Sequence, residues 1–142
     1  MSDDLHIKNI LNSLNERKKE LNCIYQISEI LNSNDQPLDE AFNKVITIIP
    51  YGWQYSDICS AQIVYNDQIY QTPRLAVNSC KQESLLMIDG KQVGSLRVFY
   101  DLKAGEEFLF LEEEQRMLDT IAEKISVFLP ENLLLHMQSR PL

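Results

Sequence analysis

Apolar residues recur every three or four positions near both ends of the chain, which is the period of a helix with one buried face. The first such segment covers residues 4–32 and contains neither glycine nor proline. It predicts one long helix, or two helices joined near residues 17–20. A second helix is expected over residues 38–49. A last helix is expected over residues 111–128, where Pro130 should stop or restart it.

Between these helical segments the apolar period changes to two residues, as in strands with one buried face. Two turn signals, Asn66-Asp67 and Asp89-Gly90, interrupt the alternating stretch, and Asp-Gly is one of the strongest two-residue hairpin signals. We therefore predict two adjacent hairpins, with strands at residues 58–65, 68–72, 84–88 and 92–100. A run of antiparallel strands flanked by helices is typical of an α+β domain.

The first helical segment also has a heptad-like seam, although Arg17 and Ser28 interrupt it. A similar apolar spacing recurs in the last helix, and both helices contain more apolar residues than one face of the sheet can bury. Two interpretations stay open: both helices simply pack on the sheet, or they also pair with the same helices of a second copy. The residues expected in that dimer interface are Leu14, Leu21, Ile24, Leu118, Ile121, Ile125 and Phe128.

The length and net charge of the chain limit the number of domains and the kinds of partner that it can have. The chain has 142 residues, enough for one hydrophobic core, and no linker or repeat divides it. Residues 1–142 are therefore expected to form a single domain. The 13 basic and 21 acidic residues give a net charge of −8, which disfavours nucleic acid and anionic membrane surfaces as partners. The absence of a signal peptide or a membrane-spanning apolar run predicts a cytoplasmic location.

The sequence contains no recognisable catalytic or metal-binding motif. Its four glycines form neither of the phosphate-binding patterns GxGxxG and GxxxxGK[ST], and its two histidines belong to no HExxH arrangement. The three cysteines lack the spacing of a zinc site or a disulfide framework. We therefore expect no enzyme activity, no metal and no resident cofactor.

Three residues remain candidates for binding a ligand. Cys80 is expected in a loop beside Lys81, where a nearby cation would lower the pKa of an exposed thiol. Trp53 and Tyr55, in the segment PYGWQY, should either close one end of the core or stack on a ligand, and the core role is favoured. The two other cysteines, Cys23 and Cys59, are expected to be small buried hydrophobes.

Four blocks of sequence occur in an order that resembles a GAF-type sensory domain. They are ERKKELNCIYQISEIL at residues 16–31, IIPYGWQYSDICSAQIVYND at 48–67, QESLLMIDGKQVGSLRVFY at 82–100 and LEEEQRMLDTIAEKI from residue 111. The resemblance covers about residues 16–129. It is strongest to the subgroup found beside histidine kinases, response regulators and phosphoenolpyruvate-synthase-like proteins. It implies a GAF/PAS-like central antiparallel sheet, with the first and last helices packed on one face and a ligand pocket, where present, on the other.

The same resemblance implies a function, because family members usually dimerise through their terminal helices and relay a signal along them. We therefore expect a non-enzymatic regulatory module that forms a parallel homodimer and acts on a partner protein or an adjacent domain. Two alternatives stay open: a small-molecule sensor with a modest pocket, and a thiol-based reductase on a GAF fold. The short connection at residues 73–83 disfavours a pocket for a cyclic nucleotide or a bilin.

Overall fold

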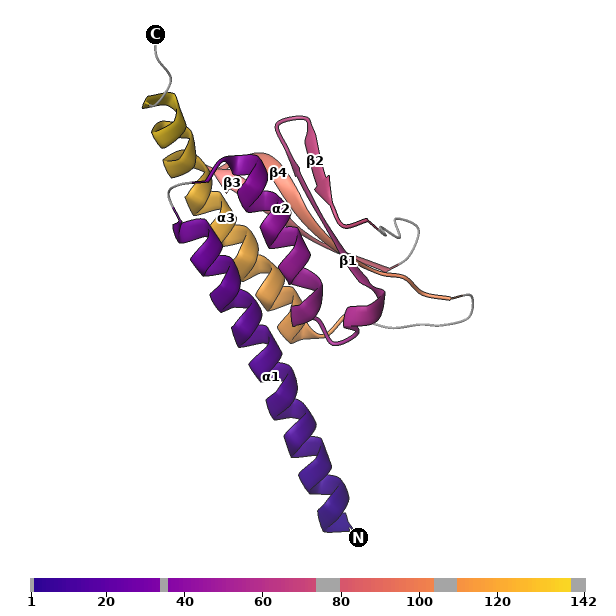
Figure 1. The fold of residues 1–142 in the computed structure, drawn as a ribbon. Helices are drawn as coiled ribbons and strands as arrows, with labels where there is room; N and C mark the ends of the chain where they lie inside the picture. The colour runs from indigo at the N-terminus through magenta and orange to yellow at the C-terminus, as the bar shows by residue number, and fades with distance from the viewer. Residues whose placement is uncertain (1, 34–35, 74–79, 104–109, 139–142) are drawn as a thin grey trace.

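The computed structural model describes residues 2–33, 36–73, 80–103 and 110–138, with side chains described from residue 3 to residue 134 within these ranges. In this part of the chain, three α-helices lie on one side of a four-stranded antiparallel sheet (Figure 1). The α+β class predicted from the sequence is therefore confirmed. The elements are α1 (Ser2–Asn32), α2 (Leu38–Ile48), the 3-10 helices η1 (Ile49–Gly52) and η2 (Ser56–Ile58), β1 (Cys59–Tyr65), β2 (Gln68–Gln71), β3 (Cys80–Ile88), β4 (Lys91–Tyr100) and α3 (Glu112–Gln138).

The sheet has the strand order β2-β1-β4-β3, and every neighbouring pair is antiparallel. Both predicted hairpins form, and β1 and β4 join them in the middle of the sheet. The two hairpin turns contain Asn66-Asp67 and Asp89-Gly90, and all four residues have positive φ angles. Asn, Asp and Gly tolerate this left-handed backbone better than other residues, which explains why these turns could be predicted.

Helix boundaries differ from the predictions at two places. The second helix ends one residue early, at Ile48, and continues as the 3-10 helix η1. The prediction that Pro130 stops or restarts the last helix is wrong, because α3 continues through it to Gln138. Leu129 is fully buried and Asn132 is 6% exposed, so packing on both sides of Pro130 holds the backbone helical despite the hydrogen bond that proline cannot make.

The helices form two layers over one face of the sheet. In the inner layer, α2 packs on β1 and β2, while α3 packs on β3 and β4. α1 forms the outer layer, because it packs mainly on α2, α3 and η1. α1 and α3 lie side by side and run in the same direction (Figure 1). The first and last helices thus lie on the same side of the sheet, as predicted, but α1 reaches the sheet chiefly through the other two helices.

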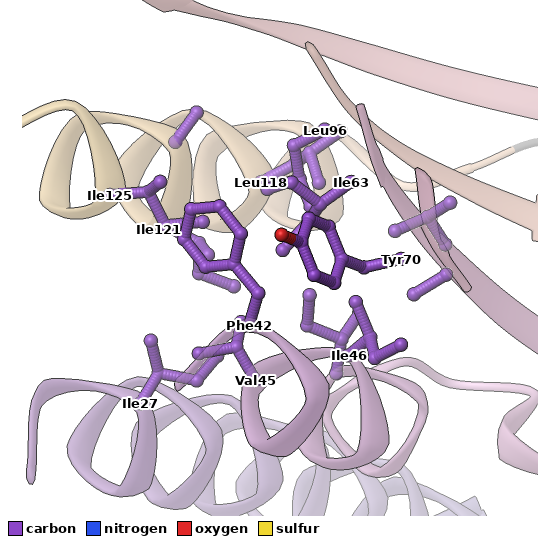
Figure 2. Close-up of a cluster of buried hydrophobic side chains, with 14 of the residues drawn as sticks. Ile27, Phe42, Val45, Ile46, Ile63, Tyr70, Leu96, Leu118, Ile121 and Ile125 are labelled. Atoms are coloured by element: carbon purple, nitrogen blue, oxygen red, sulfur yellow. The ribbon is translucent and has the colours of Figure 1, made fainter. Parts of the chain in front are cut away.

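The hydrophobic core fills the space between the sheet and the helices (Figure 2). Phe42 of α2 packs edge-on against Tyr70 of β2, with ring centroids 5.2 Å apart, and also against Phe128 of α3 at 6.3 Å. Burying a large apolar side chain stabilises a fold by about 1.5–3 kcal/mol, so these contacts fix the helices on the sheet. Core residues with no exposed surface include Ile27, Ile63, Leu96, Leu118, Ile121 and Ile125.

Candidate functional site

A long apolar surface is exposed along α1. Every side chain from Asp3 to Asn15 is exposed, and this half of the helix projects beyond the rest of the molecule (Figure 1). Between Ile7 and Tyr25 the exposed large apolar residues share one side of the helix, and each is 47–64% exposed. We call this surface the α1 stripe, and it consists of Ile7, Ile10, Leu11, Leu14, Leu21 and Tyr25.

The α1 stripe faces away from the rest of the molecule. The residues with which α1 enters the core are Cys23, Ile27 and Leu31, which are at most 8% exposed. With 3.6 residues per turn, the centre of the stripe lies about 150° around the helix from this buried row. Folding of the single chain therefore leaves the stripe unused, which makes it the candidate functional surface.

The predicted dimer interface is only partly available on the surface. Leu14 and Leu21 are exposed and belong to the α1 stripe, whereas Ile24 is half-buried against the core. The other four predicted residues are core residues with exposures of 0–7%: Leu118, Ile121, Ile125 and Phe128. Their assignment to a dimer interface is therefore corrected, because their side chains already pack within the chain. The predicted interface did not include Tyr25. Its side chain is exposed and belongs to the stripe, whereas that of Ile24 does not.

α1 is anchored at the point where its exposed half leaves the molecule. The Lys19 Nζ donates to the carbonyl oxygen of Trp53 at 3.0 Å and pairs with the Glu16 carboxylate at 3.6 Å. Gly52 lies so close to α1 that a Cβ atom there would be 2.7 Å from the Cys23 Sγ. Glycine therefore permits this approach. We call residues 52–54 the junction.

Hydrogen bonds extend from the junction to the sheet and to α3. The Trp53 Nε1 donates to the Gln82 Oε1 at 3.0 Å, and the Gln82 Nε2 donates to the Gln115 Oε1 at 3.3 Å. Gln115 in turn donates to Asp119 one turn further along α3, at 3.0 Å. The Trp53 side chain is fully buried, so it is a core residue and offers no ring face for stacking a ligand.

Glu114 is a buried carboxylate beside the junction, only 2% exposed. Its Oε2 accepts from the Gln54 N–H at 2.9 Å and from the Tyr100 hydroxyl at 2.8 Å, and its Oε1 accepts from the Leu111 N–H at 2.9 Å. The last bond is one half of a capping box, because Leu111 directly precedes α3. Burial, and then the bond to Glu114, raise the pKa of Tyr100, so its hydroxyl keeps the proton that it donates. Glu114 thus ties the start of α3 to β4 and to the junction.

Glu20 of α1 faces this acidic start of α3. Burial is the largest cause that raises the pKa of Glu20, and the charges of Glu113, Glu114 and Glu16 raise it further, while Arg17 lowers it. A carboxyl whose folded-state pKa is raised favours folding when protonated, and this contribution is lost as pH rises through the folded-state pKa. At neutral pH the ionised Glu20 therefore opposes the contact between α1 and α3.

We expect Glu20→Gln to raise the free energy of unfolding at pH 7 by less than about 1 kcal/mol, because solvent screens a partly exposed charge. The gain should shrink as pH falls toward 4, where the wild-type carboxyl is itself protonated in both states. Urea unfolding at the two pH values measures the effect. Glu29→Gln, at an exposed position of the same helix, is the matched control and should change neither value. A gain that is equal at both pH values would contradict the assignment.

Cys80 does not have the environment expected for an activated thiol. It is the first residue of β3 and pairs with Tyr100 of β4, whereas a loop position was predicted. Burial raises the pKa of the Cys80 thiol, and a hydrogen bond from the Lys81 backbone lowers it less. The expectation of a lowered pKa is therefore wrong. Burial also raises the pKa of Cys23, to about 12, and that of Cys59, in line with their expected role as hydrophobes.

Iodoacetamide should alkylate Cys80 more slowly at neutral pH than it alkylates an unstructured cysteine peptide, because the thiolate is the reactive form. Mass spectrometry of tryptic peptides after timed alkylation measures the rate at each cysteine. The same protein unfolded in urea is the control, in which the rate at Cys80 should match that of the peptide. Alkylation of the folded protein faster than of the peptide would restore the hypothesis of a reactive thiol.

The sheet face opposite the helices contains a connected row of polar side chains. Gln71, Gln62, Arg97 and Glu83 come from β2, β1, β4 and β3, and successive members are hydrogen-bonded at 3.0, 3.2 and 2.6 Å. Beside this row, Ser60 is 3% exposed, and among the described residues its Oγ has no hydrogen-bond partner. An unsatisfied buried hydroxyl is costly unless a bound group or water completes its bonding.

Tyr55 is the one sequence-predicted ligand residue with a partly accessible ring. It is 36% exposed, and its ring packs edge-on against Tyr100 with centroids 5.5 Å apart. It lines an open hollow of about 510 Å³ together with Lys19, Asp57 and other residues. Tyr55 therefore borders the junction, while Trp53 points into the core and Cys80 lies in the sheet.

No family model, curated protein or solved structure matches this chain. Within the residues described, His, Cys, Asp and Glu side chains nowhere gather in a group of three that could hold a metal ion. Among the helices described, α1 and α3 are too polar to cross a membrane, and α2, with 11 residues, is too short. The α1 stripe, the junction and the polar row on the sheet are thus the features from which a function can be argued.

Proposed function

We propose that the chain is a non-enzymatic regulatory module that forms a homodimer through the α1 stripe and relays a signal between α1 and α3. The observation that supports this most directly is the stripe itself, six large apolar residues on a helix face that the fold leaves uncovered. An isolated helix of about 15 residues is only marginally stable in water. The projecting half of α1 therefore needs a partner along its apolar side.

A second copy of the chain is the partner that best fits this surface. The stripe extends from Ile7 to Tyr25, a distance of about 27 Å along the helix, so two copies can pair along its whole length. Such a two-fold contact uses the same patch on both subunits. Interfaces below about 1,200 Å² of total buried area are often transient, so a contact of two single helices favours a reversible dimer.

The junction provides a physical route from the dimer contact to α3. Lys19 attaches α1 to the Trp53 carbonyl, and Trp53 is linked through Gln82 to Gln115 on α3. A shift of α1 in its pairing would therefore change the contacts that hold α3. This arrangement agrees with the way in which GAF-type domains, which the sequence resembles, relay signals along their terminal helices.

Light scattering coupled to size-exclusion chromatography tests the proposal. At micromolar concentrations the mass should be about 33 kDa, twice the 16.5 kDa of one chain, and should decrease on dilution. A mass of 16.5 kDa at the highest soluble concentration would overturn the proposal.

A small-molecule sensor is the second candidate function, and it is favoured by the buried Ser60 hydroxyl beside the polar row, which no described residue bonds. Arg97, in the middle of this row, is half-buried and paired with the Glu83 carboxylate at 2.6 Å, so an acidic ligand would bind there by replacing Glu83 as its partner. Native mass spectrometry of the protein purified from cells tests this candidate. A small molecule that is retained by the wild type and lost in Arg97→Gln supports the sensor, whereas a bare chain supports the first function.

A further inference from the structure

We propose that two copies paired through the α1 stripe form a binding site for a small multivalent oxyanion of the phosphate type. The site consists of Arg17 and Lys18 from both copies. This inference rests on the proposed function, because the site is incomplete until a second copy is present.

The two basic residues lie within the span of the α1 stripe. Lys18 lies between Leu14 and Leu21, one turn from each, on the same side of α1. Arg17 lies at the margin of the same stripe, and both side chains are exposed. The apolar surface is therefore interrupted at one place, and the interruption is positively charged.

The three basic residues of this part of α1 differ in whether a carboxylate on the same helix neutralises their charge. Lys19 pairs with Glu16 and with junction carbonyls, and Arg17 interacts with Glu20, one turn further on. Lys18 has no carboxylate three or four residues away in either direction, where a helix would place an ion-pair partner. Those four positions hold Leu14, Asn15, Leu21 and Asn22. A positive charge thus remains on a surface of a chain whose net charge is −8.

Pairing of two α1 helices brings these charges together whether the helices run parallel or antiparallel. The stripe runs from Ile7 to Tyr25, so its midpoint is residue 16, next to Arg17 and Lys18. In a parallel dimer the two Lys18 side chains lie at the same level. In an antiparallel dimer centred on residue 16, Lys18 lies opposite residue 14 of the second copy, and the two Lys18 residues are about 6 Å apart along the axis. The two ammonium groups of Lys18 therefore come together between apolar residues, with the Arg17 guanidinium groups at the margin of the contact.

The two Lys18 charges, which have no carboxylate one turn away on α1, repel each other across the contact, more strongly where apolar side chains exclude water. An oxyanion between them would replace this repulsion with charge-assisted hydrogen bonds, and the planar guanidinium of Arg17 can bind two oxygens at once. A multivalent anion such as phosphate should therefore strengthen the dimer more than chloride does at the same ionic strength.

Sedimentation equilibrium of the full chain in sodium chloride and in sodium phosphate of equal ionic strength tests this inference. Phosphate should lower the wild-type dimer dissociation constant by about threefold to tenfold, the effect of one or two charge-assisted bonds at an exposed site. Equal ionic strength keeps general screening constant. Tripolyphosphate and ATP are two further arms. If tripolyphosphate and ATP lower the dimer dissociation constant equally, the site recognises the phosphate chain. If ATP lowers it more, the site recognises a nucleotide.

The variant Arg17→Gln/Lys18→Gln should dimerise at least as tightly as the wild type in chloride and should not respond to phosphate. Lys81→Gln/Lys91→Gln, which removes the same charge at exposed positions of the sheet, is the control and should respond as the wild type does. A dimer that responds equally with and without Arg17 and Lys18, or that never responds, overturns the oxyanion site alone. A monomer under every condition overturns the proposed dimer and this site together.

Discussion

Replacing Glu114 with alanine should lower the free energy of unfolding by about 3–5 kcal/mol, because buried donors that lose their acceptor each cost about 1–3 kcal/mol. Three donors depend on this one carboxylate: the Leu111 and Gln54 N–H groups and the Tyr100 hydroxyl. They belong to the start of α3, the junction and β4, so the loss should loosen all three together. Urea unfolding followed by fluorescence of the single tryptophan, the buried Trp53, measures the change.

Two further variants show whether the hydrogen bonds are responsible. Glu113→Ala removes an exposed carboxylate one position earlier and should change the free energy of unfolding by less than about 0.5 kcal/mol. Tyr100→Phe removes one of the three donors and should cost about 1–1.5 kcal/mol. If Glu114→Ala is no more damaging than Glu113→Ala, the carboxylate does not hold the junction as described.

The sequence predicted those features that depend on local chemistry. The Asp89-Gly90 and Asn66-Asp67 turns could be identified because few residue types accept the backbone that a two-residue hairpin needs. The pattern of alternating residues then located the strands, and hence the α+β class. The start of β3 was missed because Lys81, Gln82 and Glu83 are three consecutive polar residues, which break the alternation of apolar and polar positions.

Tertiary packing decided what local patterns could not. Apolar spacing identifies a helix face that avoids water, but it does not say whether the chain itself or another molecule covers that face. For this reason Leu118 and Leu21 looked equivalent in sequence, although one is fully buried and the other is 63% exposed. The difference arises because α3 lies directly on the sheet, while α1 lies outside it and has an uncovered side.

The junction was also beyond prediction from the sequence. Three consecutive glutamates, residues 112–114, begin α3, and two of them are exposed, but Glu114 turns inward to the junction. A glutamate at the third helical position was the available signal, since that position completes a capping box. The partners Gln54 and Tyr100 lie 60 and 14 residues away, and only the fold brings them together.

Leu14→Arg and Leu21→Arg, made separately, should each weaken the homodimer by about a hundredfold, because each variant removes an apolar side chain from both copies and adds two cations beside the two Lys18 residues. Neither should change the unfolding free energy of the monomer by more than about 0.5 kcal/mol, since substitutions on an exposed surface rarely do. The two side chains are 58% and 63% exposed in the single chain. Loss of the dimer without loss of the fold is therefore the expected signature.

Sedimentation equilibrium of the wild type, Leu21→Arg and the control Gln26→Arg tests the central claim most directly. Gln26 is exposed on α1 but lies outside the stripe, so its variant adds the same charge to the same helix. The wild type and Gln26→Arg should sediment as dimers of about 33 kDa, twice the mass of one chain, and Leu21→Arg as a monomer of 16.5 kDa. A wild type that stays monomeric, or a Leu21→Arg dimer as tight as that of Gln26→Arg, would contradict pairing through the α1 stripe.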